Sequence, residues 1–402
     1  MARIPKAGLL GAGLMLVAAG AQAEDVKLGA LAAVTGPIPE LVADMVAAQE
    51  FAVAQINAQG GIHGGGTLQL VIADTQCDAK TAVDAATKLV NVEQVPAIVG
   101  GICSGGTIGA TQAVTIPAGV VSVSPSATSP AITDLEDNDL VFRTAPSDAY
   151  QGVELAKLAR EMGHDTLALT YANDDYNVGL AKVFAEAFTD AGGVIAGEQM
   201  HEPNKPSYRS QLATLAAGGA DALALFAYYD GSGITIMRQS LENGYFTQFL
   251  GADGMKDDAV IEQLGSELLA GNVVFTTPTS DTDTGAYQAF AEAFEASGGQ
   301  PGAPYAAQSY DAAFLLALAL EHAGNTDRAA VARSLRAVAS APGEIVRPGE
   351  WSKALELIAA GTEIDYQGAA GPHDFDENGD VTGLYSSNIV TEDGGWKTEI
   401  VE

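Results

Sequence analysis

The stretch Gly100–Thr107, which reads GGICSGGT, places a cysteine and a serine between pairs of glycines. Its centre has the G-x-C-x-G spacing of a nucleophile elbow, with Cys103 where hydrolases of that kind carry serine. A thiol nucleophile needs a histidine base within hydrogen-bond reach. The sequence identifies no partner for the five histidines, which we therefore expect to be solvated: His63, His164, His201, His322 and His373. A lone motif of this kind is weak support for catalysis, so binding is the stronger interpretation.

The same stretch is well suited to holding an anion. A strand should end at Gly100 and a helix should begin near Gly105, so free backbone N–H groups and the positive end of the helix dipole point to one place. Ser104 adds a hydroxyl there, and a carboxylate has the right size for such a spot. In the alternative interpretation Ser104 only caps its own helix, and the two roles can coexist.

A second polar turn, SPSATSP at Ser124–Pro130, also follows an expected strand. Hydroxyl side chains between two prolines form a stiff loop with N–H groups and hydroxyls facing outward. In an open parallel sheet, ligands bind beyond the carboxyl ends of the strands. Both turns lie at such ends, so we expect them to contribute to one site.

The chain begins with a segment typical of an export signal. Arg3 and Lys6 precede an apolar run at 7–20 that is too short to span a bilayer, and an A-x-A cleavage site ends at Ala23. We expect residues 1–23 to be a signal peptide and the mature protein to be exported. In an oxidising compartment, the two cysteines, Cys77 and Cys103, suggest a disulfide.

The charge of the chain excludes some partners. It has 51 acidic and 19 basic residues, for a net charge of −32, and the acidic residues are spread along the sequence. Such a surface repels nucleic acid and anionic membranes. We expect neither nucleic-acid binding nor direct membrane insertion, and no segment after the signal is apolar enough to span a membrane.

Short β-rich runs alternate with helix-length segments, which predicts parallel sheets with helices on both faces. In the first unit we expect strands at 26–31, 68–74, 96–100 and 120–124, and helices at 41–58, 79–91 and 107–114. In the second unit we expect strands at 166–171, 194–198, 222–227 and 249–252, and helices at 150–162, 179–191, 207–217 and 234–243. The last portion is mostly helical, at 287–297, 305–323, 328–338 and 351–360, and ends in a hairpin-like segment. Three extended segments, at 142–147, 275–279 and 372–380, have the character of crossings between the units.

These motifs, in this order and spacing, resemble the periplasmic branched-chain amino-acid-binding proteins, the Leu/Ile/Val-binding type of ABC-transporter receptor. The matching stretches are VTGPIPE, INAQGGIHG, DTQCDAKTAV, IVGGICSGGT, SVSPSATSP, FRTAPSDAYQG, NDDYNVG, YYDG, FLGADG and HDFDENGDVTG. Each stretch is weak alone, but together they cover nearly the whole mature chain.

The resemblance implies a fold and a mode of action. The fold would be α/β and periplasmic-binding-protein-like, with two doubly wound lobes joined by three hinge crossings. One lobe would comprise 24–145 plus 279–372, and the other 146–278 plus 373–402. The lobes would close on a ligand in the periplasm and present it to ABC permease subunits at the inner membrane, without enzymatic activity and without a cofactor. The resemblance also implies that Cys77 pairs with Cys103.

The resemblance further implies the ligand contacts. Ser104, Ser126 and Thr128, with local N–H groups around Ala127, would meet an α-carboxylate. Asp253, in FLGADG, would meet the α-ammonium, and the second lobe would also supply Tyr176, Tyr228 and Tyr229. This assignment of the carboxylate to the first lobe and the ammonium to Asp253 is physically sound, because buried charges cost several kcal/mol unless they are paired and hydrogen-bonded. Other interpretations remain: Asp253 is also a typical turn residue, the tyrosines could be core or rim aromatics, and Tyr228 and Tyr229 cannot both point inward from one strand.

The chain departs from the resemblance at the loop Ile38-Pro39-Glu40-Leu41, where the branched-chain binders tend to carry an aromatic residue near Leu41. We expect the ligand to be a small amino acid, branched-chain or related, or, in the alternative, an amide or aromatic acid, and this loop is where members of the family should differ in ligand. A sensory protein of the same fold is a further alternative. Glu40 would contact a polar ligand tail or face water.

The segment from Asp374 to Asp380 matches the first half of an EF-hand loop. Its twelfth position is Tyr385, where a calcium site needs a bidentate glutamate. We therefore expect a turn between strands and no metal site.

Overall fold

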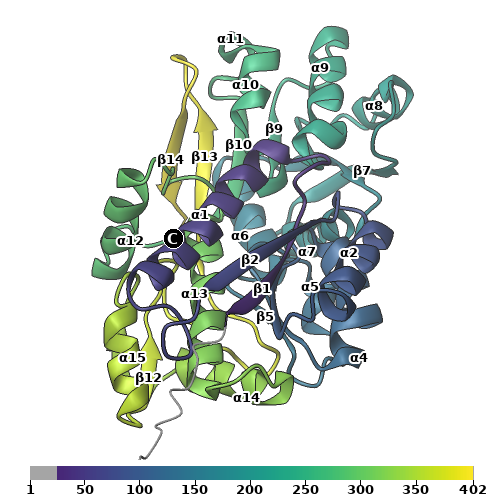
Figure 1. The fold of residues 1–402 in the computed structure, drawn as a ribbon. Coiled ribbons are helices and arrows are strands. Elements are labelled where there is room, and N and C mark those ends of the chain that lie inside the picture. The colour runs from purple at the N-terminus through teal and green to yellow at the C-terminus, as the bar shows by residue number, and fades with distance from the viewer. Residues whose placement is uncertain (1–24, 402) are drawn as a thin grey trace, which may run out of the picture.

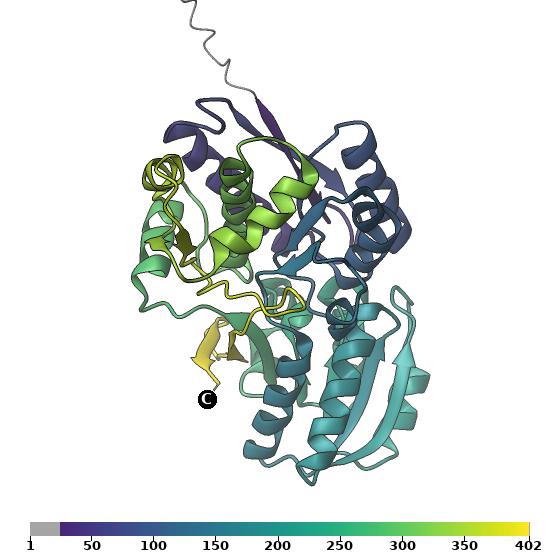
Figure 2. The same cartoon turned by 90° about the horizontal axis from the view of Figure 1, so that it is seen from below.

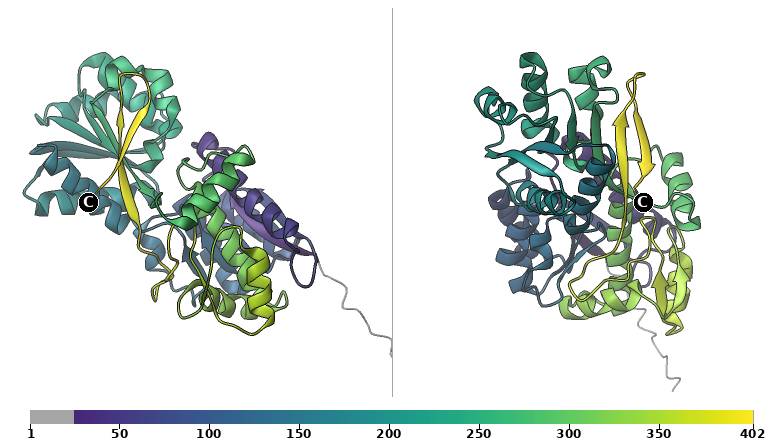
Figure 3. Two further views of the ribbon diagram at one scale, coloured as in Figure 1. Left: turned by 90° about the vertical axis from the view of Figure 1, so that its left-hand side faces the viewer. Right: turned by 180° about the vertical axis from the view of Figure 1, so that it is seen from behind.

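The computed structural model of the protein describes residues 25–401 and shows two α/β lobes (Figure 1). The predicted signal peptide, residues 1–23, lies outside the described residues. Figure 3 shows the lobes as two separate masses, with the hairpin of the last two strands, in yellow, at the edge of one of them. The predicted fold class, two doubly wound α/β lobes joined by three crossings, is confirmed. None of the helices in residues 25–401 combines the length and the apolar character needed to cross a bilayer.

The first lobe contains a five-stranded parallel sheet in the order β2-β1-β3-β4-β5. Its strands are β1 (Val26–Ala32), β2 (Leu68–Asp74), β3 (Ala97–Gly100), β4 (Val121–Ser124) and β5 (Val141–Arg143). The central strands β3 and β4 are buried along their whole length, which is why they read as continuous runs of small and β-branched residues.

Helices cover both faces of this sheet. One face packs against α1 (Pro39–Ala58), α13 (Ala306–Ala323) and α14 (Arg328–Ala339), and the other against α2 (Ala79–Asn91). Helix α13 is the centre of the lobe, because every residue from 306 to 320 is buried. Segments that are distant in sequence, in purple and light green, therefore lie together in this lobe (Figure 2).

The second lobe contains a seven-stranded sheet in the order β14-β13-β10-β9-β8-β6-β7. The parallel strands are β6 (Thr166–Ala172), β7 (Val194–His201), β8 (Ala222–Phe226), β9 (Phe249–Gly251) and β10 (Val273–Thr279). The antiparallel hairpin β13 (Leu384–Val390) and β14 (Trp396–Ile400) adds to the β10 edge. Leu167 and Leu169 pack on one face and Ala168 on the other, as the two-residue period of a strand requires.

Helices flank both faces of the second sheet as well. The helices of this lobe are α6 (Asp148–Glu161), α7 (Asp175–Asp190), α8 (Arg209–Ala216), α9 (Ile234–Asn243), α10 (Asp258–Leu264) and α11 (Ser266–Leu269). The remaining first-lobe elements are α3 (Ser104–Ala110), α4 (Ile116–Ala118), α5 (Pro130–Thr133), α12 (Gly285–Ala296), α15 (Trp351–Ala359), β11 (Glu344–Val346) and β12 (Ile364–Tyr366). Short π-helical segments occupy Thr111–Thr115 and Tyr229–Gly233, and a 3-10 turn occupies Asp253–Met255.

Element boundaries differ from prediction in a few places. Helix α1 begins at Pro39, two residues early, because proline is well suited to the first helical position. Helix α3 begins at Ser104 instead of residue 107 and passes into the π-helical segment at Thr111. The terminal hairpin spans β13 and β14, while most of the segment before it, residues 373–383, is irregular.

The first and third crossings are joined by a buried ion pair. Arg143 Nη2 lies 2.6 Å from Asp380 Oδ2, and Arg143 Nε donates to Asp380 Oδ1 at 2.7 Å. Phe375 and Val381, which follow residue 372, pack in the same cluster as Phe142 of the first lobe. The expected lobe boundaries, 24–145 plus 279–372 and 146–278 plus 373–402, stay a proposal.

The predicted disulfide between Cys77 and Cys103 is confirmed. It ties the connection after β2 to the residue that precedes α3. The loop that it closes spans a sequence separation of 26 residues. The bond therefore anchors the polar turn after β3 to the connection between β2 and α2.

We expect the double variant Cys77→Ser/Cys103→Ser to unfold with a free energy lower by about 3–4 kcal/mol, because a loop of this length gains that much chain entropy when it is opened. Chemical denaturation without reductant measures this difference. A reductant should lower the stability of the wild type to that of the variant and leave the variant unchanged. Equal stability of both proteins without reductant would contradict the prediction.

Candidate functional site

The carboxyl ends of both sheets face each other around a small cavity of about 20 Å³. This is room for about one water molecule. The first lobe lines it with Ile38, Leu41, Ile102, Ser104, Ser126 and Tyr305, and the second with Tyr176, Tyr228, Asp253 and Gly254. The cavity thus lies where the ligand of an open α/β sheet is expected.

The first-lobe wall is built from the two turns that follow β3 and β4. Gly100 has a φ of 109°, and a Cβ atom there would lie 2.5 Å from the Leu31 carbonyl oxygen, so the turn requires glycine. Ser126 Oγ donates to the Ile102 carbonyl at 3.0 Å, and Ser104 Oγ accepts the Ser129 N–H at 3.2 Å. The two turns therefore brace each other and place their serine hydroxyls side by side.

The second-lobe wall presents a carboxylate. Asp253 follows β9 and is only 6% exposed. Its Oδ1 accepts hydrogen bonds from Gln151 Nε2 at 2.9 Å and from Tyr176 Oη at 3.0 Å. The rings of Tyr176 and Tyr228 stack with centroids 5.3 Å apart, which forms one side of the cavity.

Burial sets the electrostatics of this wall. It raises the pKa of Asp253 above its usual range, and the hydrogen bonds from Gln151 and Tyr176 oppose that rise. Burial also raises the pKa of Tyr176 and Tyr305 far above the usual range, so both phenols stay neutral. The arrangement can hold a cationic group on Asp253 and hydrogen-bond acceptors on the serine side.

Five of the predicted site residues line the cavity: Ser104, Ser126, Tyr176, Tyr228 and Asp253. Three others are not brought to it. The Ala127 N–H donates to Ser124 Oγ at 2.9 Å, and the Thr128 hydroxyl donates to Asp148 Oδ2 at 3.0 Å. The Tyr229 hydroxyl donates to the Glu40 carboxylate. In this arrangement their polar atoms serve the walls of the cavity.

Sequence reasoning missed half of the lining. Ile38 and Leu41 lie in the loop where the chain departs from the branched-chain binders, so a signal existed there, and Ile102 lies inside the first motif. Tyr305 had no such signal. It precedes the buried helix α13 with a φ of 62°, a backbone conformation that tyrosine rarely adopts.

The two lobes are in direct contact around the cavity. Tyr229 of the second lobe donates to Glu40 of the first, and Glu40 is otherwise exposed, in line with the expectation that it faces water. Ser129 Oγ donates to the Asp175 carbonyl across the lobes at 2.9 Å. These contacts hold the lobes together on either side of the serine turns.

The expectation of solvated histidines is wrong for three of the five. His164, His201 and His373 are buried, and burial lowers the pKa of His201 to about 4 and that of His373 to about 3. Buried histidines of this kind stay neutral and structural at neutral pH. Cys103 carries no thiol, because its sulfur is bonded to Cys77.

The EF-hand-like segment is a turn, as expected. Asp376 Oδ1 accepts the N–H groups of Asn378 and Asp380 at 2.8 and 3.0 Å, and the Asp380 carboxylate is engaged by Arg143. Within residues 25–401, no cluster of three or more acidic, histidine or cysteine side chains is arranged to hold a metal ion.

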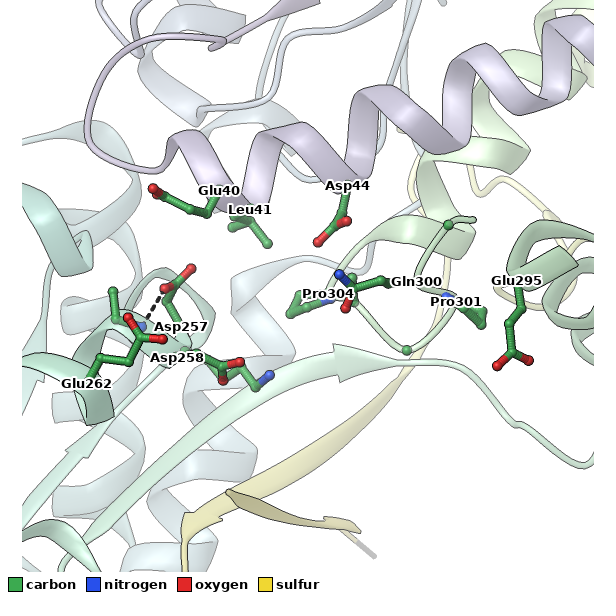
Figure 4. A pocket seen from close by; sticks show the side chains of 15 residues that line it. Glu40, Leu41, Asp44, Asp257, Asp258, Glu262, Glu295, Gln300, Pro301 and Pro304 are labelled. Atoms are coloured by element: carbon green, nitrogen blue, oxygen red, sulfur yellow. Dashed lines mark hydrogen bonds between the residues drawn. The ribbon is translucent and has the colours of Figure 1, made fainter. Parts of the chain in front are cut away.

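A larger hollow of about 610 Å³ opens beside the cavity, and Leu41 lines both. Carboxylates of α1 and of the start of α10 face one another across it (Figure 4). Its acidic residues are Glu40, Asp44, Asp257, Asp258, Glu262 and Glu295. Burial raises the pKa of Asp44 and Asp257, and the hollow as a whole disfavours anions.

Two α/β lobes that face each other across a small cavity with a buried carboxylate on one wall define a two-lobed ligand-binding protein of the hinge-closing class. Comparison with known families agrees. The chain belongs to the periplasmic binding protein family, which matches residues 25–382. Members of this family are solute-binding proteins.

Individual relatives span nearly the same length. The chain is 29% identical over 316 residues to a leucine-, isoleucine-, valine-, threonine- and alanine-binding protein of Pseudomonas aeruginosa, covering 78% of this chain and 83% of the relative. It is 28% identical to a substrate-binding protein of a chemotactic signal transduction system from Halobacterium salinarum, covering 88% and 84%. An ABC transporter substrate-binding protein from Desulfitobacterium hafniense in complex with Leu superposes with a TM-score of 0.71 and 26% identity, covering 94% of this chain and 100% of that chain.

The bond between Tyr229 and Glu40 should favour the closed arrangement of the lobes. We expect Tyr229→Phe to shift the population towards open forms, because a hydrogen bond to a carboxylate is worth about 1.5–3 kcal/mol. Small-angle scattering should then give a larger radius of gyration for the variant without added ligand.

Tyr171→Phe is the matched control, since Tyr171 donates to Glu198 at 2.9 Å within the second lobe. That variant should keep the wild-type radius. Equal radii for Tyr229→Phe and the wild type would show that this contact does not bias closure.

Proposed function

We propose that this protein is the periplasmic solute-binding component of an ABC importer and that it binds a small α-amino acid between its lobes. One observation carries the proposal. Asp253, a buried acceptor, lies across a single cavity from Ser104 and Ser126, and the Ser126 hydroxyl, which donates to the Ile102 carbonyl in this arrangement, would turn to the ligand on binding. A zwitterion needs an acceptor at one end and donors at the other, and only a paired charge is tolerated in a buried site.

The ligand would lie with its ammonium on Asp253 and its carboxylate on the serine turns. Tyr176 and Tyr228 would pack against it from the second lobe, and Ala127 and Thr128 would hold the serine turn in place through their bonds to Ser124 and Asp148. The aliphatic side chains of Ile38, Leu41 and Ile102 line the same cavity and favour an aliphatic ligand side chain. The relative from Pseudomonas aeruginosa, named for binding leucine, isoleucine, valine, threonine and alanine, supports this ligand class.

Binding requires movement of the lobes. A cavity of about 20 Å³ is smaller than any amino acid, so the lobes must separate about the three crossings to admit one. A ligand that contacts both walls then stabilises the closed form through its differential affinity for it. Tyr229 would act in this step through Glu40, without touching the ligand.

Location and partner follow from the same proposal. The signal peptide at 1–23 would deliver the protein to the periplasm, and the closed form would dock on ABC permease subunits at the inner membrane. Closure needs no cofactor and no enzymatic step. The relative from Halobacterium salinarum favours a second candidate, a sensory role in which the closed form contacts a receptor instead.

A thermal-shift panel on ligand-stripped protein tests the ligand class. It would contain alanine, threonine, valine, leucine, isoleucine, an amide and benzoate. We expect at least one α-amino acid to raise the melting temperature, since a ligand at 100 times its Kd stabilises the native state by about 2.7 kcal/mol. Asp253→Ala should abolish that shift, and Asp230→Ala, at an exposed position of the same lobe, should keep it.

Two results would overturn parts of the proposal. An Asp253→Ala variant that binds the amino acid as tightly as the wild type would remove Asp253 from the site. A response to benzoate or the amide with no response to any amino acid would replace the ligand class.

Ligand affinity should depend on pH through Asp253. Burial raises the pKa of this carboxyl, so the charge that pairs with the ammonium is lost as pH falls through that raised value. Calorimetric titration with the responding amino acid should therefore show affinity that is highest near neutral pH and falls at a higher pH than an ordinary aspartate would produce. Asp253→Asn should bind weakly at every pH. A flat profile for the wild type would contradict the assignment.

A further inference from the structure

The Tyr305 hydroxyl, which lines the cavity, is buried without a hydrogen-bond partner, and so are two acceptor oxygens on α6 beside the cavity. The two α6 acceptors are Asp148 Oδ1 and Gln151 Oε1, and both residues are fully buried. A buried acceptor without a donor costs about 1–3 kcal/mol, and native proteins contain few of them. Both lie on α6 at positions i and i+3, which places their side chains next to each other on one face of the helix.

The other polar atoms of these two side chains are firmly assigned. Gln151 Nε2 donates to Asp253 Oδ1 at 2.9 Å and to the Thr276 carbonyl at 3.0 Å, so its oxygen must be the acceptor end. Asp148 Oδ2 accepts the Thr128 hydroxyl at 3.0 Å, and the Asp148 N–H donates to the Thr128 carbonyl at 2.8 Å. The free oxygens are therefore two acceptors in need of one donor.

We propose that Asp148 is held as a neutral carboxylic acid whose Oδ1–H donates to Gln151 Oε1. A single proton, taken from solvent as the protein folds, gives a partner to both oxygens. It completes a continuous hydrogen-bonded chain of side chains from the serine turns of the first lobe to the carboxylate of the second: Thr128, Asp148, Gln151 and Asp253. Asp148 is a positioning residue in this chain.

The charges around Asp148 agree with a neutral form. Burial and the negative charge of Asp253 raise its pKa, and Thr128 and Arg143 oppose that rise. The guanidinium of Arg143 is already paired with Asp380. The titratable and charged groups that face Asp148 are Asp253, Arg143, Tyr176, Tyr228, Tyr305 and Tyr385. The four tyrosines stay neutral because burial raises their pKa, so an ionised Asp148 would have no free cation to pair with.

The proton has a consequence for the site. It leaves Asp253 as the single negative charge at the cavity, which matches a ligand with one ammonium group. This consequence rests on the proposed function, whereas the protonation of Asp148 does not.

Carbonyl spectroscopy tests the proton directly. Infrared difference spectra of wild type minus Asp148→Asn, with carboxyl-labelled aspartate, neutral pH and no added ligand, should show the carbonyl band of a protonated acid that shifts in heavy water. An ionised carboxylate signal in its place would overturn the proposal. That result would leave the amino-acid proposal standing, and a failed ligand panel would leave this band unaffected.

Thermal unfolding against pH provides the second readout. A carboxyl with a raised pKa contributes stability that is complete below its unfolded-state pKa and is lost as pH rises towards its folded-state pKa. The side-chain amide of the Asp148→Asn variant would offer the same donor and acceptor without taking up a proton. We therefore expect Asp148→Asn to match the wild type in acid and to exceed its melting temperature at neutral pH.

Two further variants complete the test. Asp148→Ala should be less stable than Asp148→Asn at every pH, because it deprives Thr128 and Gln151 of their partner. Asp380→Asn is the matched control for a charged buried carboxylate, and it should lose stability at neutral pH because Arg143 loses its ion-pair partner. An Asp148→Asn variant that falls as far as Asp380→Asn would show that Asp148 is ionised.

Discussion

The arrangement of the site depends on one buried cation. Arg143, at the end of β5, has five N–H groups, and each of them is used. Two bind the Asp380 carboxylate, one binds the Thr133 hydroxyl, and two bind the carbonyls of Ala127 and Ser129. The guanidinium thus joins the first and third crossings to the turn that carries the serine side of the cavity. A lysine could not replace it, because a single ammonium cannot satisfy a carboxylate fork and a turn at once.

The two walls of the cavity are specified by different kinds of force. The first-lobe wall is a set of mutual hydrogen bonds between two turns, and it is formed before any ligand arrives. The second-lobe wall is a carboxylate that burial disfavours and that neighbouring donors partly compensate. The serine turns offer hydrogen-bond donors to an anionic group, and Asp253 offers an acceptor to a cationic group. A zwitterionic ligand is complementary to both walls. The ligand's two charged groups can therefore both be paired only when the lobes close on it.

The sequence predicted those parts of the fold and site that depend on local pattern. Alternating strands and helices, the two serine turns and the Asp-Gly turn at Asp253 are each readable from a few neighbouring residues. The sequence did not reveal how Thr128 and Tyr229 would use their hydroxyls, because Asp148 and Glu40 lie on other elements. Tyr305 was missed because its place in the cavity depends on the path of the chain into α13. These features depend on contacts between residues that are distant in sequence, and a short stretch of sequence does not contain that information.

The contact between Glu40 and Tyr229 has an evolutionary consequence. Glu40 lies in the first turn of α1, next to Ile38 and Leu41, which line the cavity. Substitutions that reshape this segment for a different ligand would also disturb the hydrogen bond between Tyr229 and Glu40 that links the lobes. Ligand selectivity and the equilibrium between open and closed forms are therefore coupled through this segment. A change of ligand specificity would have to be accompanied by substitutions that restore the contact between the lobes.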